Sequence, residues 1–123
     1  MRILVIEDDA FLRKAYEVGL RHQGFDVNLA SDGEMGLRMA EEIRPDAIVL
    51  DVLLPKLSGV EVLQRLKGNP SLRNIKVIVF SVSCDEEEFR AILRLGADGY
   101  CSKSGTDLNQ LGQTIRSLCA RNI

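Results

Sequence analysis

The sequence predicts an α/β fold in which a five-stranded parallel sheet carries helices on both faces. Short apolar runs of strand length alternate with longer segments whose apolar residues recur at helical spacing. Two of the runs, residues 47–50 and 77–80, are continuously apolar, as expected for strands covered on both faces. Because crossovers between parallel strands are right-handed, few topologies remain. The simplest is a flavodoxin-like (βα)5 sheet with strand order 2-1-3-4-5.

Each predicted strand is followed by a predicted helix. The strands are expected at residues 2–7, 25–30, 46–51, 75–80 and 97–101. The first helix carries an apolar stripe that we expect to face the core, formed by Phe11, Leu12, Ala15, Val18 and Leu20. Gly24 is placed to end this helix. The second helix begins with a capping box in which Ser31 and Glu34 each satisfy a backbone N–H, and Pro45 stops it.

The other three helices also have recognisable starts. The third begins with a second capping box, Ser58 to Glu61, and runs to Gly68. The fourth has residues 83–86 at its head and an apolar side formed by Phe89, Ile92 and Leu93. The fifth opens near Thr106, and its apolar residues recur at spacings of three and four as Leu108, Leu111, Ile115 and Leu118.

Composition narrows the class of protein. A chain of 123 residues is expected to form one domain over residues 1–123, and it buries about two-thirds of its unfolded surface. The net charge of −2 argues against direct contact with nucleic acid. No apolar run approaches the roughly 20 residues that span a membrane, and the N-terminal apolar stretch is too short for a signal peptide. We therefore expect a soluble protein of the cytoplasm.

The cysteines agree with that compartment. Cys84, Cys101 and Cys119 are odd in number and widely spaced, so they form neither a CxxC metal pair nor a closed disulfide set. Reduced thiols are typical of cytosolic proteins. We expect all three to be reduced and mostly buried.

Polar residues able to do chemistry follow four of the predicted strands. They are Asp8 and Asp9 after the first, Asp51 at the end of the third, Ser81 after the fourth and Lys103 just past the fifth. The carboxyl ends of parallel strands share one edge of the sheet, where ligands bind in open α/β folds. Since the first strand lies beside the third in the predicted order, the three aspartates become neighbours. Alone, Asp8 or Asp9 would equally serve as the N-cap of the first helix.

Charge balance at this edge favours a metal ion. Two carboxylates about 4 Å apart repel by about 1 kcal/mol in water and by more at lower dielectric. Lys103 supplies one positive charge, and Mg²⁺ would supply two more while accepting the hard oxygen ligands available here. The lack of convergent His or Cys argues against zinc. A metal, a carboxylate, a hydroxyl and an ammonium together suit phosphoryl transfer, with a carboxylate as the nucleophile.

The same residues belong to a longer pattern. In order, the chain contains Asp8-Asp9, Asp51 to Pro55 with Gly59, Ser81, Gly96 to Tyr100, and Lys103. This set resembles the receiver domain of bacterial two-component response regulators, and it covers essentially the whole chain. No single piece is specific, whereas the full set is.

The resemblance implies roles for these residues. Asp51 would accept a phosphoryl group from a phosphohistidine on a sensor histidine kinase or a histidine phosphotransfer protein. Asp9, Asp51 and the backbone carbonyl of Leu53 would ligate Mg²⁺ directly, with Asp8 helping through water. Lys103 would pair with the phosphoryl oxygens.

The resemblance also implies how phosphorylation would be signalled from the site to the protein surface. Ser81 would hydrogen-bond the phosphoryl group and Tyr100 would change rotamer with it, which couples the site to the face formed by the fourth helix, fifth strand and fifth helix. That face would contact a downstream output protein or domain, and a homodimer stays open. The chain would be a switch in a phosphorelay. It is not expected to be a conventional enzyme, although it would catalyse its own phosphorylation and dephosphorylation.

The sequence departs from the family pattern near two site residues. Ser104 follows Lys103, where a proline in a cis peptide is usual, and Val82 follows Ser81, where a small residue is common. A non-proline cis bond costs about 3 kcal/mol, which favours a trans peptide. Leu54 replaces a frequent Met with little change in volume. Leu53 and Ser83 occupy positions that tune phosphoryl lifetime in the family.

Other functions stay open. One is a receiver-like interaction module that is not phosphorylated. Another is a Mg²⁺-dependent phosphohydrolase or phosphotransferase with an aspartyl nucleophile, although the chain has no insertion long enough to form a cap over a substrate. A third is a flavin or nucleotide binder, which lacks support because there is no GxGxxG or GxxxxGKS/T motif.

Overall fold

The sheet topology predicted from the sequence is confirmed. The computed structural model describes residues 1–82 and 85–120. Its strands are β1 (Arg2–Ile6), β2 (Asp26–Ala30), β3 (Ala47–Leu50), β4 (Lys76–Ser81) and β5 (Gly99–Ser102). Its helices are α1 (Ala10–His22), α2 (Gly33–Ile43), α3 (Gly59–Gly68), α4 (Glu86–Arg94) and α5 (Leu108–Ala120). The strands pair in parallel in the order β2-β1-β3-β4-β5.

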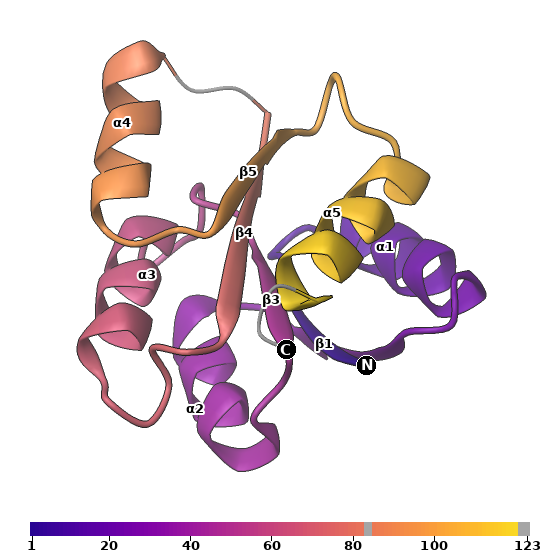
Figure 1. Ribbon diagram of the computed structural model, residues 1–123, viewed down its shortest axis with the longest axis horizontal. Coiled ribbons are helices and arrows are strands. Elements are labelled where there is room, and N and C mark those ends of the chain that lie inside the picture. The colour runs from indigo at the N-terminus through magenta and orange to yellow at the C-terminus, as the bar shows by residue number, and fades with distance from the viewer. Residues whose placement is uncertain (83–84, 121–123) are drawn as a thin grey trace.

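Helices cover both faces of the sheet, as Figure 1 shows. Successive strand residues point to opposite faces, so each strand contributes to two cores. The core between the sheet and the helices α1 and α5 contains the strand residues Ile3, Val5, Val49 and Ile78 and the helix residues Tyr16, Leu20, Leu111 and Ile115. The core between the sheet and the helices α2, α3 and α4 contains the strand residues Leu4, Ile6, Ile48 and Leu50 and the helix residues Ala40, Leu63, Leu66 and Ile92. Coverage on both faces explains why the central strands read as continuous apolar runs.

The face that α1 turns toward the sheet differs from the predicted one. Phe11 is 79% exposed and Val18 is 58% exposed, whereas Tyr16 and Leu20 are buried. The helix carries two stripes at helical spacing, and the one that packs inward is Leu12, Tyr16 and Leu20. This stripe faces the sheet because the Tyr16 ring packs edge-on against Phe80 of β4, with ring centroids 5.3 Å apart.

Glu17 is a buried charged residue on α1. Its carboxylate pairs with two cations of the same helix, Lys14 at 2.9 Å and Arg21 at 3.2 Å. The hydrogen bond from Lys14 and the charge of Arg21 hold the pKa of Glu17 below its usual value.

The predicted cap of α2 is displaced by one residue. The carboxylate of Asp32 accepts the Met35 N–H at 2.8 Å, and the Ser31 hydroxyl lies 3.7 Å from the Met35 sulfur instead. Because the helix begins one residue later than expected, Glu34 stands in its first turn without the reciprocal position of a capping box. Asp32, and not Ser31, is therefore the N-cap of α2.

This displacement predicts a difference between two alanine variants. Asp32→Ala is expected to lower the free energy of unfolding by about 1 kcal/mol, because it removes a side-chain acceptor for the helix N-terminus. Ser31→Ala removes no cap and is expected to change it by less than about 0.5 kcal/mol. Urea unfolding followed by circular dichroism measures both. Equal losses in the two variants would contradict the observed cap.

The starts of the other helices are also set by side chains. In α3 the Ser58 hydroxyl accepts the Glu61 N–H at 3.2 Å, as predicted. In α4 the cap is Asp85, which accepts the Glu88 N–H at 2.8 Å. The residues predicted at its head, Ser83 and Cys84, lie outside the described residues, so their expected roles stay predictions.

The fifth helix begins just beyond the predicted position near Thr106. Asp107 accepts the Gln110 N–H at 2.8 Å, and the Gln110 side chain accepts the Asp107 N–H at 2.9 Å. This reciprocal pair is a capping box that the sequence prediction missed. It follows the loop after β5 and sets where α5 starts.

Two further expectations concern thiols and membranes. Of the cysteines that the structure describes, Cys101 is buried and Cys119 is partly exposed, and both are free thiols. Cys84 lies outside the described residues. Across residues 1–82 and 85–120, no helix combines the length and apolar character needed to cross a membrane.

Gly59 sets how closely α3 approaches the end of β3. A Cβ atom added at Gly59 would lie 2.4 Å from both the Asp51 carbonyl oxygen and the Val52 Cα. Both atoms are backbone, so the chain after β3 would have to move. The Gly59 N–H also donates to the Val52 carbonyl at 3.0 Å. The absence of a side chain here therefore helps place Asp51.

The two ends of α3 provide a matched pair of variants. Gly59→Ala is expected to destabilise the fold by about 1–3 kcal/mol through overpacking. Gly68→Ala, where an added Cβ meets nothing within 4 Å, is expected to be neutral or to stabilise by up to about 1 kcal/mol. Urea midpoints compare them directly. A Gly59→Ala protein as stable as Gly68→Ala would show that the close approach is not required.

Candidate functional site

The sheet register brings two acidic residues together at the carboxyl edge. Ile6 of β1 pairs with Leu50 of β3, so the next residues, Glu7 and Asp51, leave the sheet side by side. The Asp51 N–H donates to the Ile6 carbonyl at 3.2 Å and continues the ladder by one residue. Both carboxylates are buried, with Glu7 2% and Asp51 7% exposed.

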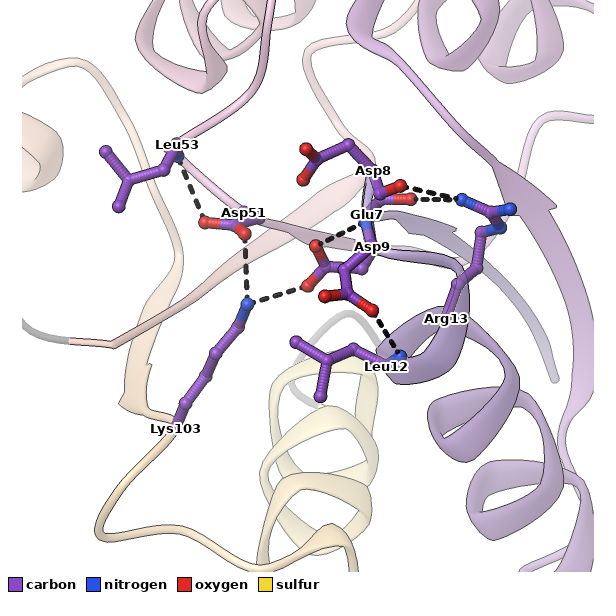
Figure 2. Close-up of polar contacts among 8 residues, drawn as sticks. All are labelled: Glu7, Asp8, Asp9, Leu12, Arg13, Asp51, Leu53 and Lys103. Carbon is purple, nitrogen blue, oxygen red and sulfur yellow. Dashed lines mark hydrogen bonds and ion pairs between the residues drawn. The ribbon is translucent and has the colours of Figure 1, made fainter.

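Lys103 lies between these two carboxylates, as Figure 2 shows. Its Nζ is 2.6 Å from Glu7 Oε1 and 2.9 Å from Asp51 Oδ2. Lys103 is the first residue after β5, and its backbone N–H donates to the Ser81 carbonyl at 2.7 Å. The structure thus joins two predicted site residues, Asp51 and Lys103, with one that was not predicted.

Glu7 is the site residue that sequence reasoning missed. The predicted first strand ends at Glu7, and the predicted acidic pair, Asp8 and Asp9, follows it. The structure instead gathers Glu7, Asp8 and Asp51, whose carboxylate oxygens lie within 4.8 Å of one another. A usable signal exists, because Glu7 and Asp51 are each the first polar residue after a fully apolar run.

Asp9 lies apart from this acidic cluster. Its carboxylate accepts the Leu12 N–H at 3.0 Å and caps α1, while its own N–H donates to Glu7 Oε2 at 3.2 Å. The structure therefore differs from the expectation that Asp9 stands beside Asp51 as a metal ligand. The chain has already turned into the helix at Asp9, so its side chain satisfies the helix N-terminus.

Burial and charge compete across the Glu7–Lys103–Asp51 contacts. Burial raises the pKa of Glu7, and the hydrogen bond from Lys103 only partly offsets this rise. Burial acts to lower the pKa of Lys103, but the hydrogen bonds that its ammonium donates to Glu7 and Asp51 outweigh burial and raise that pKa above its usual range. Lys103 is therefore a permanent cation. With their carboxyls ionised, three acids face one ammonium, which leaves a net negative site.

Asp51 uses both of its carboxylate oxygens. Oδ2 accepts from Lys103, and Oδ1 accepts the Leu53 N–H at 3.0 Å. The Leu53 side chain is exposed beside the site. These two contacts fix the plane of the carboxylate, and the role of the Leu53 carbonyl as a ligand stays a prediction.

Ser81 ends β4 on the same edge. Its side chain is fully buried, and its hydroxyl has no hydrogen-bond partner among residues 1–82 and 85–120. A buried hydroxyl without a hydrogen bond lowers the stability of the fold by about 1–3 kcal/mol and is therefore unusual. A ligand oxygen bound at this edge would supply the missing hydrogen-bond partner.

Tyr100 lies on β5 and is half-buried. Its ring packs edge-on against Phe89 of α4, with centroids 5.4 Å apart and planes 76° apart. The contact ties the middle of β5 to the fourth helix. The predicted change of Tyr100 rotamer stays a prediction.

The turn after Lys103 is held by hydroxyl groups. No peptide among the described residues is cis, so the bond between Lys103 and Ser104 is trans, as favoured for a residue other than proline. Ser104 Oγ lies 2.9 Å from Ser102 Oγ, which donates to the Val82 carbonyl at 3.3 Å. Val82 itself is exposed. On the inner side, the Lys103 Nζ lies 5.9 Å from the ring centroid of Tyr16.

The donor chemistry of the acidic cluster fits Mg²⁺. Glu7, Asp8 and Asp51 offer hard carboxylate oxygens from two neighbouring strand ends. His22, the only histidine of the chain, lies at the far end of α1, and this set contains no thiol. A divalent cation would also offset the net negative charge that Lys103 leaves.

Comparison with known proteins decides the family. A family model described as the response regulator receiver domain matches residues 3–116. The chain belongs to this family. The receiver domain is 42% identical over 120 residues to the transcriptional regulatory protein PrrA of Mycobacterium leprae, covering 98% of this chain and 50% of that protein. It is 39% identical over 104 residues to the regulatory protein PhoP of Bacillus subtilis, covering 83% of this chain and 42% of that one.

Solved receiver domains share its fold. The receiver domain of a Francisella response regulator superposes with a TM-score of 0.90 at 26% identity, over 99% of this chain and 98% of that one. The receiver domain of a Pseudomonas aeruginosa sensor histidine kinase, solved with a magnesium ion coordinated in its active-site cleft, gives 0.87 at 26% identity over 97% of each chain. This receiver domain spans about half the length of the curated relatives it matches. The resemblance inferred from the sequence is confirmed.

Proposed function

We propose that this receiver domain is a phosphorylation-controlled switch in which Asp51 accepts a phosphoryl group from a phosphohistidine in a Mg²⁺-dependent reaction. The donor would be a sensor histidine kinase or a histidine phosphotransfer protein. One observation carries the proposal, namely the buried Asp51 carboxylate paired with Lys103 beside the Glu7–Asp8 acids. The module would signal rather than turn over an external substrate.

The chain's own groups are arranged for transfer to Asp51. An Asp51 oxygen attacks phosphorus, an O–P bond forms, and the N–P bond of the donor breaks as its imidazole leaves and regains a proton. Mg²⁺ held by Glu7, Asp8 and Asp51 would supply positive charge against the phosphoryl oxygens. Lys103 exchanges part of its contact with Asp51 for a phosphoryl oxygen. The Leu53 N–H keeps the carboxylate oriented.

The unpaired hydroxyl of Ser81 supports a role as a sensor. It is fully buried at the end of β4 and lacks a partner among the described residues, so a phosphoryl oxygen at Asp51 would give it one. On the next strand, Tyr100 packs against Phe89 of α4. A shift at the end of β4 would reach the α4–β5–α5 face through this ring, and an output protein or domain would read it there.

Intact mass spectrometry tests the proposal. The protein is incubated with acetyl phosphate and Mg²⁺, and in parallel with EDTA in place of Mg²⁺. The expected result is one acid-stable, base-labile phosphoryl adduct that needs the metal. If the wild-type protein forms no adduct, the proposal fails and a receiver-like interaction module without phosphorylation becomes the better reading.

The observed acidic cluster also predicts which aspartate holds the metal. Asp8→Asn is expected to weaken Mg²⁺ binding at least about tenfold, because one carboxylate contact to a cation is worth several kcal/mol at intermediate dielectric. Asp9→Asn is expected to bind Mg²⁺ nearly as the wild type does, since asparagine also caps helices. Calorimetric titration with MgCl₂ measures both. The reverse order would restore Asp9 as the ligand predicted from the sequence.

A further inference from the structure

We propose that Arg13 is a positioning residue that holds the turn between β1 and α1 so that Asp8 meets Glu7 and Asp51 around the cation. The inference rests on the proposed Mg²⁺-dependent function and extends it to a residue outside the acidic cluster. Arg13 lies on the first turn of α1 and points back toward the end of β1, as Figure 2 shows.

One guanidinium nitrogen of Arg13 bridges two backbone carbonyls. Its Nη1 donates to the Glu7 carbonyl at 2.9 Å and to the Asp8 carbonyl at 3.3 Å. The backbone N–H of the same residue donates to the Asp9 carbonyl at 2.8 Å. Arg13 therefore contacts all three residues of the turn that carries the acids.

Asp8 depends on this backbone more than its neighbours do. The Glu7 carboxylate is held by Lys103 and by the Asp9 N–H, and the Asp51 carboxylate by Lys103 and the Leu53 N–H. Among the residues that the structure describes, no hydrogen bond or ion pair holds the carboxylate of Asp8. Its position beside the other acids is set by the turn, and the side chain that holds the turn is Arg13.

Positioning and simple charge make opposite predictions for Arg13. A guanidinium near a cation site repels the cation, so charge alone predicts tighter Mg²⁺ binding when Arg13 is removed. Residues that orient metal ligands instead cost about 10–100-fold in affinity when removed. Because the signs differ, a titration separates the two roles.

Calorimetric titration with MgCl₂ compares three variants with the wild-type protein. Arg13→Met is expected to weaken binding at least about tenfold. Arg13→Lys keeps the charge and a single donor nitrogen in place of the guanidinium, and it is expected to retain more affinity than Arg13→Met. Lys14→Met removes the same charge from the next position, where Lys14 pairs with Glu17 away from the turn. It is expected to leave the affinity within about twofold.

Amide hydrogen exchange without metal supplies a second readout. Arg13→Lys is expected to speed exchange at the Asp9 N–H, which donates to Glu7, while the Leu111 N–H in α5 keeps its wild-type rate. The exchange measurement on Arg13→Lys remains informative even if Arg13→Met does not fold. Unchanged or tighter Mg²⁺ binding by a folded Arg13→Met protein, or unchanged exchange at Asp9, would overturn the inference. Absence of Mg²⁺ binding by the wild type would instead count against the proposed function.

Discussion

An Asp51→Asn variant is expected to form no phosphoryl adduct with acetyl phosphate and Mg²⁺, whereas the wild-type protein forms one. Asparagine lacks the anionic oxygen that attacks phosphorus. It keeps the size of the side chain and an oxygen for the Leu53 N–H, so the local backbone contact at 3.0 Å survives. The loss is therefore expected in the chemistry and not in folding. Intact mass spectrometry measures it directly.

The other end of β3 offers the matched control. Asp46 precedes this strand as Asp51 follows it, and the Asp46 carboxylate accepts the Arg2 N–H at 2.8 Å on the opposite edge of the sheet. Asp46→Asn is expected to be phosphorylated at the wild-type level. An undiminished adduct in Asp51→Asn would show that another residue is the acceptor and would sink the assignment of Asp51.

Replacing Lys103 by methionine is expected to lower the free energy of unfolding by about 3–5 kcal/mol in EDTA, since it removes one partner of a buried ion pair. Glu7 and Asp51 would then face each other across the space that the ammonium occupies, with contacts of 2.6 Å and 2.9 Å lost. Methionine keeps the apolar stem, so the change is mainly one of charge.

Magnesium should reverse much of this loss. A ligand that binds only the folded state stabilises it, and the Lys103→Met site carries one more net negative charge than the wild type. Millimolar Mg²⁺ is therefore expected to raise the urea midpoint more in Lys103→Met than in the wild type. Although Mg²⁺ binding is retained in Lys103→Met, the downstream response to phosphorylation should be blunted, because no ammonium remains to pair with the phosphoryl oxygens.

An exposed lysine gives the reference for that experiment. Lys14→Met removes an exposed ammonium from Glu17, whose carboxylate keeps its pair with Arg21, and is expected to cost less than about 1 kcal/mol, with no special response to Mg²⁺. If Lys103→Met lost no more stability than Lys14→Met, Lys103 would not be the cation that offsets the buried acids.

Much of the fold and part of the site could be predicted because the signals are local. Strand and helix periods differ, and they locate each element before any contact is known. The right-handed crossover then leaves the order confirmed here, which places Asp51 and Lys103 on one edge. Topology thus brings two residues 52 positions apart to the same edge, and the side-chain contact between them is seen only in the structure.

The sequence-based predictions differ from the structure where the outcome depends on a shift of one residue along the chain or on the rotation of a helix about its axis. Asp8 and Asp9 are chemically equivalent in the sequence, yet Asp9 caps α1 and Glu7 takes the place beside Asp51. In the same way, the N-cap of α2 is Asp32, one residue after the predicted Ser31. Such choices depend on where the chain leaves the sheet, and the apolar pattern locates that point only approximately.

For this protein the sequence by itself determined the order of strands and helices, the acidic edge and the family, because periodicity and strand ends act over a few residues. The tertiary structure decided which acids meet, which face of α1 packs inward and that Arg13 holds the turn. Those outcomes depend on strand register, here Ile6 against Leu50, and on helix rotation, set by Tyr16 against Phe80. Register and rotation are settled only when distant elements pack together.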